Sequence, residues 1–209
     1  TAMAVSLLGG IVLMLAGLIL CPWVLQWMQV PAHLLEDSVT YLRIYFFSML
    51  PLILYNMGSG ILRAAGDAKR PMIYLALGGV CNIVLDWLFL TVFPWGIAGV
   101  AWATVLSQTL SAGMVFWHLL RTKKEYRVTL RKIRIHKRKL AMILRIGLPA
   151  GFQSMLLTFS NMAVQYHIHG FGENAMAAFS SYFKIENFMY LPILAFGQAM
   201  PTFAGQNIG

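Results

Sequence analysis

The sequence predicts an all-α membrane protein, and its composition is the first reason. Apolar residues make up 59% of the 209 residues, charged residues only 11%, and the mean hydropathy is +0.69. A soluble domain has roughly half apolar and about a quarter charged residues. So low a charge content means that most of the surface contacts something other than water. We therefore expect the lipid bilayer as the main partner.

Six apolar segments are long enough to cross a bilayer, since a helical crossing needs about 20 mostly apolar residues. They cover residues 3–28, 41–62, 71–93, 96–120, 140–169 and 174–206. The last two exceed the minimum, so we expect tilt or kinks there. Pro149, Pro192 and Pro201 are the expected kink positions, because proline removes a backbone donor and clashes with the preceding turn.

The basic residues predict how these segments cross the membrane. Loop 64–70 contains Lys69 and Arg70, and segment 121–139 holds ten of the sixteen Lys and Arg residues. The alternate loops contain neither type, and they cover residues 29–40, 94–95 and 170–173. Because cytoplasmic loops carry an excess of Lys and Arg, we place the two basic loops in the cytoplasm. The protein is then a multi-pass protein of the cytoplasmic membrane.

Segment 121–139 is also the best domain boundary. We expect four helices of a first transmembrane lobe in residues 1–120, a basic cytoplasmic inter-lobe linker in 121–139, and two helices of a second lobe in 140–209. The linker is either solvated or lies on anionic headgroups, where each nearby Lys or Arg is worth about 1 kcal/mol. Nucleic acid is not an expected partner despite the net charge of +9, because apolar spans flank the basic segment.

Motifs of several other protein classes are missing from the sequence. Cys21 and Cys81 lie in apolar runs and lack the CxxC or Cys/His spacing of metal sites. The spans contain no HExxH motif, no clustered His and Asp residues, and no nucleophile–base pair. A channel would need a filter or ring motif, which is also missing. We therefore expect neither an enzyme nor a cofactor.

Ionisable residues inside the spans are the first candidates for function, because charge at membrane depth is costly and usually faces a bundle interior or a water-filled cavity. Asp86 lies in the third span, and Lys184 and Glu186 lie in the sixth. A buried carboxyl can exchange a proton or neutralise a cation, so we favour a functional role for Asp86. For Lys184 we favour a permanent salt bridge with a carboxylate over competition with a transported ion.

Large uncharged polar residues recur near these groups at helical spacing. Asn82 and Asp86 form an i, i+4 pair, and Gln108 lies between Thr104 and Ser111 in the fourth span. Ser and Thr in such stripes commonly form hydrogen bonds between helices, whereas several large amides need further partners. The candidate ion- and substrate-binding residues are therefore Asn82, Asp86, Gln108, Asn161, Gln165, Lys184 and Glu186. Aromatic residues such as Tyr182 and Tyr190 can hold an organic cation by cation–π contact.

Several stretches resemble the multidrug and toxic compound extrusion (MATE) family. GILRAAGDAKRPM at 60–72 is similar to the family's cytoplasmic turn, in which Gly66 and Asp67 suit a tight bend. NIVLD at 82–86, followed by GIAGVAWATVLSQ at 96–108, matches a further family progression. IGLPAGFQ resembles the opening of the family's second lobe, and FAGQNIG resembles the end of that lobe's second helix.

The resemblance implies twelve helices in two six-helix lobes, of which this chain supplies part, so the remaining helices of the same full-length protein are expected partners. It implies a cation-coupled antiporter, driven by Na⁺ or H⁺, that exports small organic cations and drugs by alternating access. Some family branches carry an acid on the helix at 140–169, and this sequence has none there. The alternative function is a lipid-linked saccharide flippase of the same superfamily, whose cavity often holds several cations.

Overall fold

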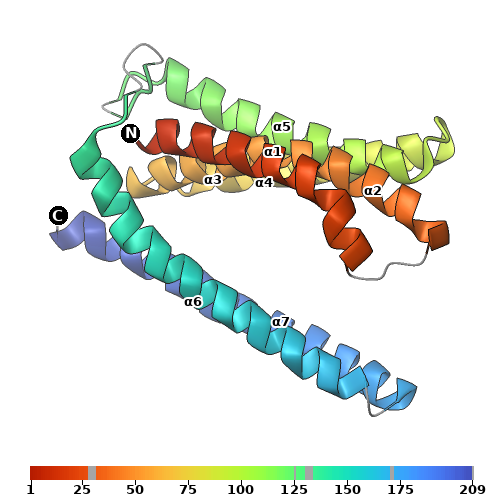
Figure 1. The fold of residues 1–209 in the computed structure, drawn as a ribbon. Helices are drawn as coiled ribbons and strands as arrows, with labels where there is room; N and C mark the ends of the chain where they lie inside the picture. Colours follow the sequence, from red (N-terminus) through yellow and green to blue (C-terminus); the bar gives the residue numbers. More distant parts are fainter. Residues whose placement is uncertain (28–31, 125, 130–133, 170–171, 209) are drawn as a thin grey trace. The chain divides into compact units, whose positions relative to one another are not determined.

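The computed structural model describes residues 1–27, 32–124, 126–129, 134–169 and 172–208, and its regular elements are helices throughout that described part. The chain divides into two compact units, Thr1–His136 and Lys137–Gly209 (Figure 1). The first contains α1 (Ala2–Trp27), α2 (Ala32–Phe47), α3 (Met49–Ala64), α4 (Lys69–Thr91) and α5 (Gly96–Arg121). The second contains α6 (Lys137–His169) and α7 (Glu173–Ile208). Each unit is described here by itself.

The predicted all-α membrane class is confirmed. Five helical segments are long and apolar enough to cross a membrane, and they are α1, the stretch from His33 to Ala64, α4, α5 and most of α6. The sixth predicted span corresponds to α7, which has 36 residues but is not among these five. Polar residues along α7, among them Lys184, Glu186 and Gln198, lower its hydropathy.

The predicted loop at 29–40 is wrong over its second half, because α2 already begins at Ala32. Glu36 and Asp37 were taken to mark a loop. They are exposed residues of the first turns of α2, so the helix continues beyond the apolar segment that starts at 41. Charged residues are compatible with a helix at this end, where the chain leaves the hydrocarbon region.

α2 and α3 are separated by a single residue, Ser48. Pro51 explains the interruption, since it has no N–H to give to the Phe47 carbonyl and its ring clashes with that group. Ser48 adapts to the break, with its backbone N–H (2.9 Å) and its hydroxyl (2.6 Å) both donating to the Tyr45 carbonyl. α2 and α3 therefore act as one interrupted span.

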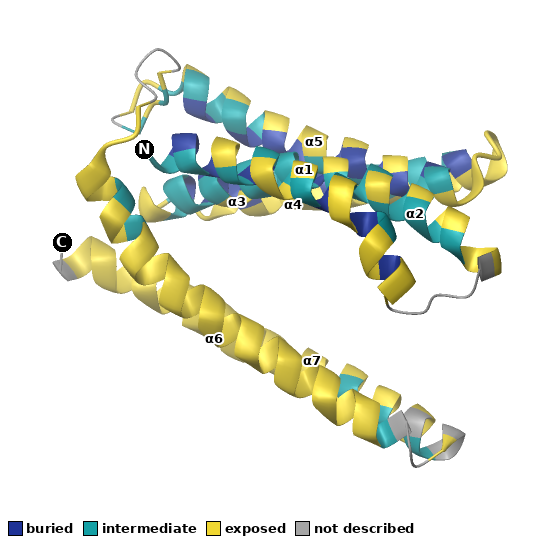
Figure 2. Ribbon diagram, in the orientation of Figure 1, coloured by how far each residue is buried: buried dark blue, intermediate teal, exposed yellow. Residues whose placement is uncertain are grey.

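The core of the first unit lies around α5, which packs against α2, α3 and α4. Tyr55 and Leu62 of α3 meet Val115 and Leu119 of α5 in a buried cluster, and Figure 2 shows how burial concentrates in this unit. The helices approach closely at Gly58, where a Cβ atom would collide with Val115. Small residues at such contacts are typical of helices packed in a membrane.

The cytoplasmic turn between α3 and α4 has the geometry that the sequence predicts. Gly66 adopts φ +83°, a left-handed conformation that suits glycine. The Asp67 carboxylate accepts a hydrogen bond from the Arg70 backbone N–H (3.2 Å) and forms an ion pair with the Arg70 guanidinium (2.6 Å). The same guanidinium lies 3.2 Å from Nε2 of His118, so the turn is joined to the end of α5.

The first residues after α5 fold back onto the first unit. The Val128 N–H donates to the Leu119 carbonyl (3.0 Å), and the Arg127 guanidinium donates to the Leu120 carbonyl (3.1 Å). Both carbonyls belong to the last turn of α5, where no helical partner is available. Tyr126 and Val128 also pack against the buried cluster. The start of the predicted linker is thus docked on the first unit.

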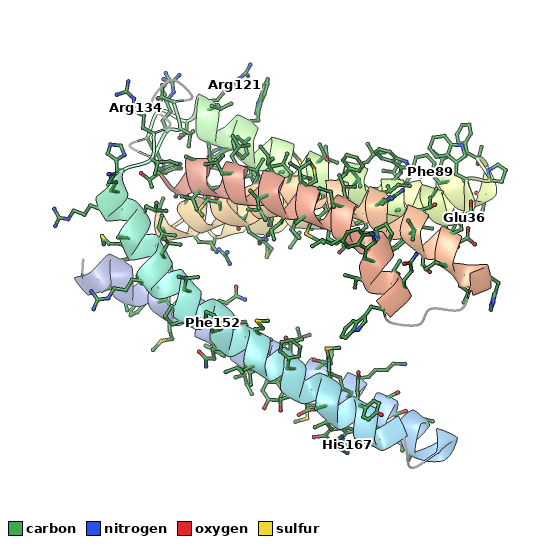
Figure 3. The ribbon with its side chains drawn as sticks, in the orientation of Figure 1. Glu36, Phe89, Arg121, Arg134, Phe152 and His167 are labelled. Atoms are coloured by element: carbon green, nitrogen blue, oxygen red, sulfur yellow. The ribbon has the colours of Figure 1, made fainter. Side chains whose placement is uncertain are left out.

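The second unit is an antiparallel pair of long helices, α6 and α7 (Figure 1). Nearly all of its described residues are exposed, including large apolar side chains such as Phe152, Leu156 and Phe196 (Figures 2 and 3). Exposed apolar faces along both helices are compatible with contact to lipid or to further helices.

Candidate functional site

The site begins where α4 and α5 touch most closely, at Gly78. A Cβ atom at Gly78 would overlap the Ser111 hydroxyl and come within 3.2 Å of the Ser107 carbonyl. Ser111 is buried, and its hydroxyl donates to the Tyr74 carbonyl of α4 (3.2 Å) and lies equally close to the Ser107 carbonyl of its own helix. Glycine on one helix and serine on the other therefore bring the two backbones together.

A small polar pocket of about 190 Å³ opens beside this contact. Polar side chains from both helices line it together with two glycines and Leu75, and the polar ones are Asn82, Thr104, Ser107, Gln108 and Ser111. The hydroxyl groups of Thr104 and Ser107 each donate to a carbonyl of their own helix, at 3.2 and 2.9 Å. The two amides are thus the groups with free hydrogen-bonding capacity.

Three partly buried side chains of this region have a polar atom that finds no partner among the residues the structure describes. They are Asn82 at Nδ2, Asp86 at Oδ1 and Gln108 at Oε1. Asp86 lies one helical turn after Asn82 on α4. Leaving such an atom unpaired costs about 1–3 kcal/mol, and more for a charged group. A cation or a water network at these atoms would remove that cost.

The sequence prediction for this region matches the geometry in part. Asn82 and Gln108 line one pocket, with Thr104 and Ser111 beside them. Asp86 is not among the lining residues but has an unpaired oxygen on the same helix. Ser107 and Gly78 were missed. A serine in an apolar helix gives no sign of what faces it, and Gly78 differs from its neighbour Gly79 only through the helix opposite.

The other four predicted residues belong to the second unit. Asn161 and Gln165 lie one turn apart on α6, and both are exposed. On α7, Lys184 is exposed and Glu186 is half-buried. Within this unit the structure does not gather them into a pocket. Their part in a binding site stays a prediction.

Comparison with known proteins settles the family. The MatE family model matches residues 1–88 and 149–209, which together are well over half of the chain. The chain belongs to the MATE family. The matched ranges include Asn82 and Asp86 on α4 and all four candidate residues of the second unit.

Curated relatives of this MATE chain carry multidrug resistance names. The chain is 35% identical over 195 residues to the probable multidrug resistance protein YpnP of Bacillus subtilis, covering 93% of the chain and 43% of that protein. It is 33% identical to the probable multidrug resistance protein YoeA of the same organism, over 100% of the chain and 47% of the relative. The chain thus spans about half the length of the curated relatives it matches.

Solved MATE structures have the same fold over this region. A multidrug resistance MATE family transporter of the MOP superfamily, in an outward-facing conformation, superposes with a TM-score of 0.88 at 28% identity. That match covers 96% of the chain and 45% of the transporter. The Vibrio cholerae MATE transporter VcmN gives the same TM-score at 21% identity, covers 97% of the chain and 46% of its own, and supports the fold alone. The chain is therefore part of a multi-pass helical transporter bundle.

Proposed function

We propose that the complete protein is an antiporter of the cytoplasmic membrane, driven by Na⁺ or H⁺, that exports small organic cations and drugs. The names of the curated relatives support drug export. The observation that carries the coupling part is the group of unpaired polar atoms on Asn82, Asp86 and Gln108.

The coupling cation is placed at these three side chains because they need it most. A carboxylate with an unpaired oxygen and two amide groups supply oxygen ligands, which small hard cations prefer. A proton on Asp86 would neutralise the same charge without a metal ion. In either case occupation of the site removes an uncompensated buried group, so binding and release of the cation change the energy of α4 against α5.

The size of the pocket separates the ion from the drug. Pockets that hold drug-sized molecules have volumes of about 300–1,000 Å³. The pocket between α4 and α5 has about 190 Å³, which suits an ion with a few waters. The drug therefore needs a larger cavity, to which we assign Asn161 and Gln165 of α6 and Glu186, Tyr182 and Tyr190 of α7.

Alternating access follows if ion and drug favour different states of the protein. A ligand shifts a conformational equilibrium only by its differential affinity for the two states. In the proposed cycle the cation enters from outside and stabilises one state, and the drug binds from the cytoplasm or inner leaflet once the cation has left. Lys184, at the level of the acids, competes with the cation or forms a salt bridge with one of them.

The test follows efflux of a fluorescent organic cation from cells that lack their own exporters. The full-length parent protein is compared with Asp86→Asn and with Asp37→Asn at matched expression. Asp37 is an exposed acid of α2 outside the pocket between α4 and α5, so it controls for loss of a negative charge. We expect gradient-driven efflux in the parent and in Asp37→Asn, and none in Asp86→Asn.

Two other results would redirect the proposal. Full efflux by Asp86→Asn would assign that carboxyl a structural role and remove it from the coupling step. Absence of efflux for every organic cation tested, with the parent present in the membrane, would favour the lipid-linked saccharide flippase instead.

A further inference from the structure

A second cavity on the first unit differs in character from the polar pocket. It is an open groove of about 620 Å³ on the outer side of α4 and α5. Its lining is mostly apolar and includes Tyr74, Leu106, Leu110, Gly113, Met114 and Trp117. Thr109 also contributes, but its hydroxyl donates to the Val105 carbonyl (2.7 Å), so it presents little free polarity to the groove.

The length of the groove matches one leaflet of a bilayer. The lining residues of α5 extend from Leu106 to Trp117, which at about 1.5 Å per residue is a rise of about 16 Å. The hydrocarbon core of a bilayer is about 30 Å thick, so one leaflet is about 15 Å deep. Gly113 in the middle of the groove has no side chain, and a Cβ atom there would meet nothing within 4 Å. The groove is thus deep enough for one acyl chain.

The end of the groove at Trp117 carries positive charge. The Arg121 guanidinium lies over the Trp117 ring, 3.9 Å from its centroid. Among the residues that the structure describes, Arg121 has no ion pair, whereas Arg70 on the facing helix is bound to Asp67 and approaches His118. Figure 3 shows Arg121 at the C-terminal end of α5. A free guanidinium fixed on an exposed tryptophan is a suitable donor pair for a phosphate.

Further cations surround this end of the groove. Lys69 and Arg70 begin α4, one turn before Tyr74, and Lys123 and Lys124 follow α5. All four are exposed. Tryptophan and arginine at the level of the headgroups are typical of the membrane interface, and basic clusters attract anionic lipids of the cytoplasmic leaflet.

We propose that this groove binds an anionic phospholipid of the cytoplasmic leaflet, with one acyl chain along α5 and the headgroup phosphate on Arg121. Charge complementarity and a leaflet-deep apolar lining support that occupant over a soluble anion, which has no use for the apolar part. The site is separate from the polar pocket and does not depend on the proposed transport cycle.

The test uses fluorescence quenching of Trp117 in the full-length protein. The protein is reconstituted in phosphatidylcholine vesicles that contain a minor fraction of acyl-brominated phosphatidylglycerol or, in a parallel series, acyl-brominated phosphatidylcholine. The difference between parent and Trp117→Phe isolates the emission of Trp117. We expect stronger quenching by the anionic lipid, and a preference lowered about five-fold in Arg121→Gln, as the loss of one cation at an anionic surface predicts.

Two further variants complete the design. Lys123→Gln removes a neighbouring exposed cation that does not line the groove, and it should keep the preference. Gly113→Leu fills the groove without a backbone clash and should reduce quenching by both brominated lipids. The proposal is overturned by equal quenching with the two lipids, by equal loss in Lys123→Gln and Arg121→Gln, or by a Trp117 that neither lipid reaches because another helix of the complete protein covers it.

Discussion

Asn82 of α4 and Gln108 of α5 line the same pocket, and each has a buried polar atom with no partner in the described part of the chain. Groups retained in this condition reduce stability until something binds them. The pocket is therefore expected to favour ion binding at the expense of the stability of the empty protein.

Asn82→Leu tests this trade-off, because leucine has a similar size and no polar atom. Without the coupling cation, we expect the full-length variant to be as stable as the parent, or more stable by about 1–3 kcal/mol. Efflux should fall strongly at the same time. Thermal unfolding in cation-free buffer and the efflux assay measure the two effects. A variant that unfolds more readily yet transports normally would show that Asn82 holds the helices together.

The neighbouring glycines of α4 offer a matched pair for the helix contact. Gly78→Ala places a methyl group against the Ser111 hydroxyl, and overpacking of this kind costs about 1–3 kcal/mol. Gly79→Ala meets nothing within 4 Å, and it should be neutral or stabilise the helix by up to about 1 kcal/mol. Thermal unfolding of the two variants side by side gives the comparison. Equal melting temperatures would contradict the close contact at Gly78.

The cytoplasmic turn predicts a graded response at Asp67. Asp67→Ala removes the acceptor for the Arg70 N–H, which is worth about 1 kcal/mol for a capping side chain. It also removes an ion pair with a half-exposed guanidinium, worth less than about 1 kcal/mol in water. Asp67→Asn keeps the acceptor and loses only the charge, so it should lie between parent and Asp67→Ala in unfolding free energy. The reverse order would mean that the charge, and not the capping bond, stabilises the turn.

The docked start of the linker predicts protection from protease. Val128→Asp introduces a charge against the apolar cluster on which Val128 packs, so the segment should detach from α5. Trypsin should then cleave after Lys123, Lys124 or Arg127 faster than in the parent. Lys139→Gln, an exposed change in α6, is the control for altered charge near the linker. Unchanged cleavage in Val128→Asp would show that the segment is open in both proteins.

Most of the fold could be predicted because apolar length and charge alone determine where helices cross a bilayer. The predicted spans at 71–93 and 96–120 agree with α4 and α5 to within two residues. The failure at 32–40 has a physical cause, since Glu36 and Asp37 end the apolar pattern but do not end the helix. The break at Ser48 was missed, although Pro51 in the sequence could have indicated it.

The candidate site could be predicted only as far as one helix at a time. Helical spacing placed Asn82 with Asp86, and Gln108 with Thr104 and Ser111, but it could not say which stripe faces which. That information lies in the contact between Gly78 and Ser111, which depends on the packing of two helices. For Asn161, Gln165, Lys184 and Glu186 the facing partners are still open, and their binding role stays a prediction.

The most direct test of the account is exchange of drug for ion by the purified full-length protein in vesicles. An organic cation is added on one side, and the flux of sodium or protons in the opposite direction is recorded for the parent and for Asp86→Asn. We predict an ion flux that starts with the drug, depends on its concentration and disappears in Asp86→Asn. Drug movement without any opposite ion flux in the parent, or an undiminished flux in Asp86→Asn, would contradict the assignment of the coupling cation to α4 and α5.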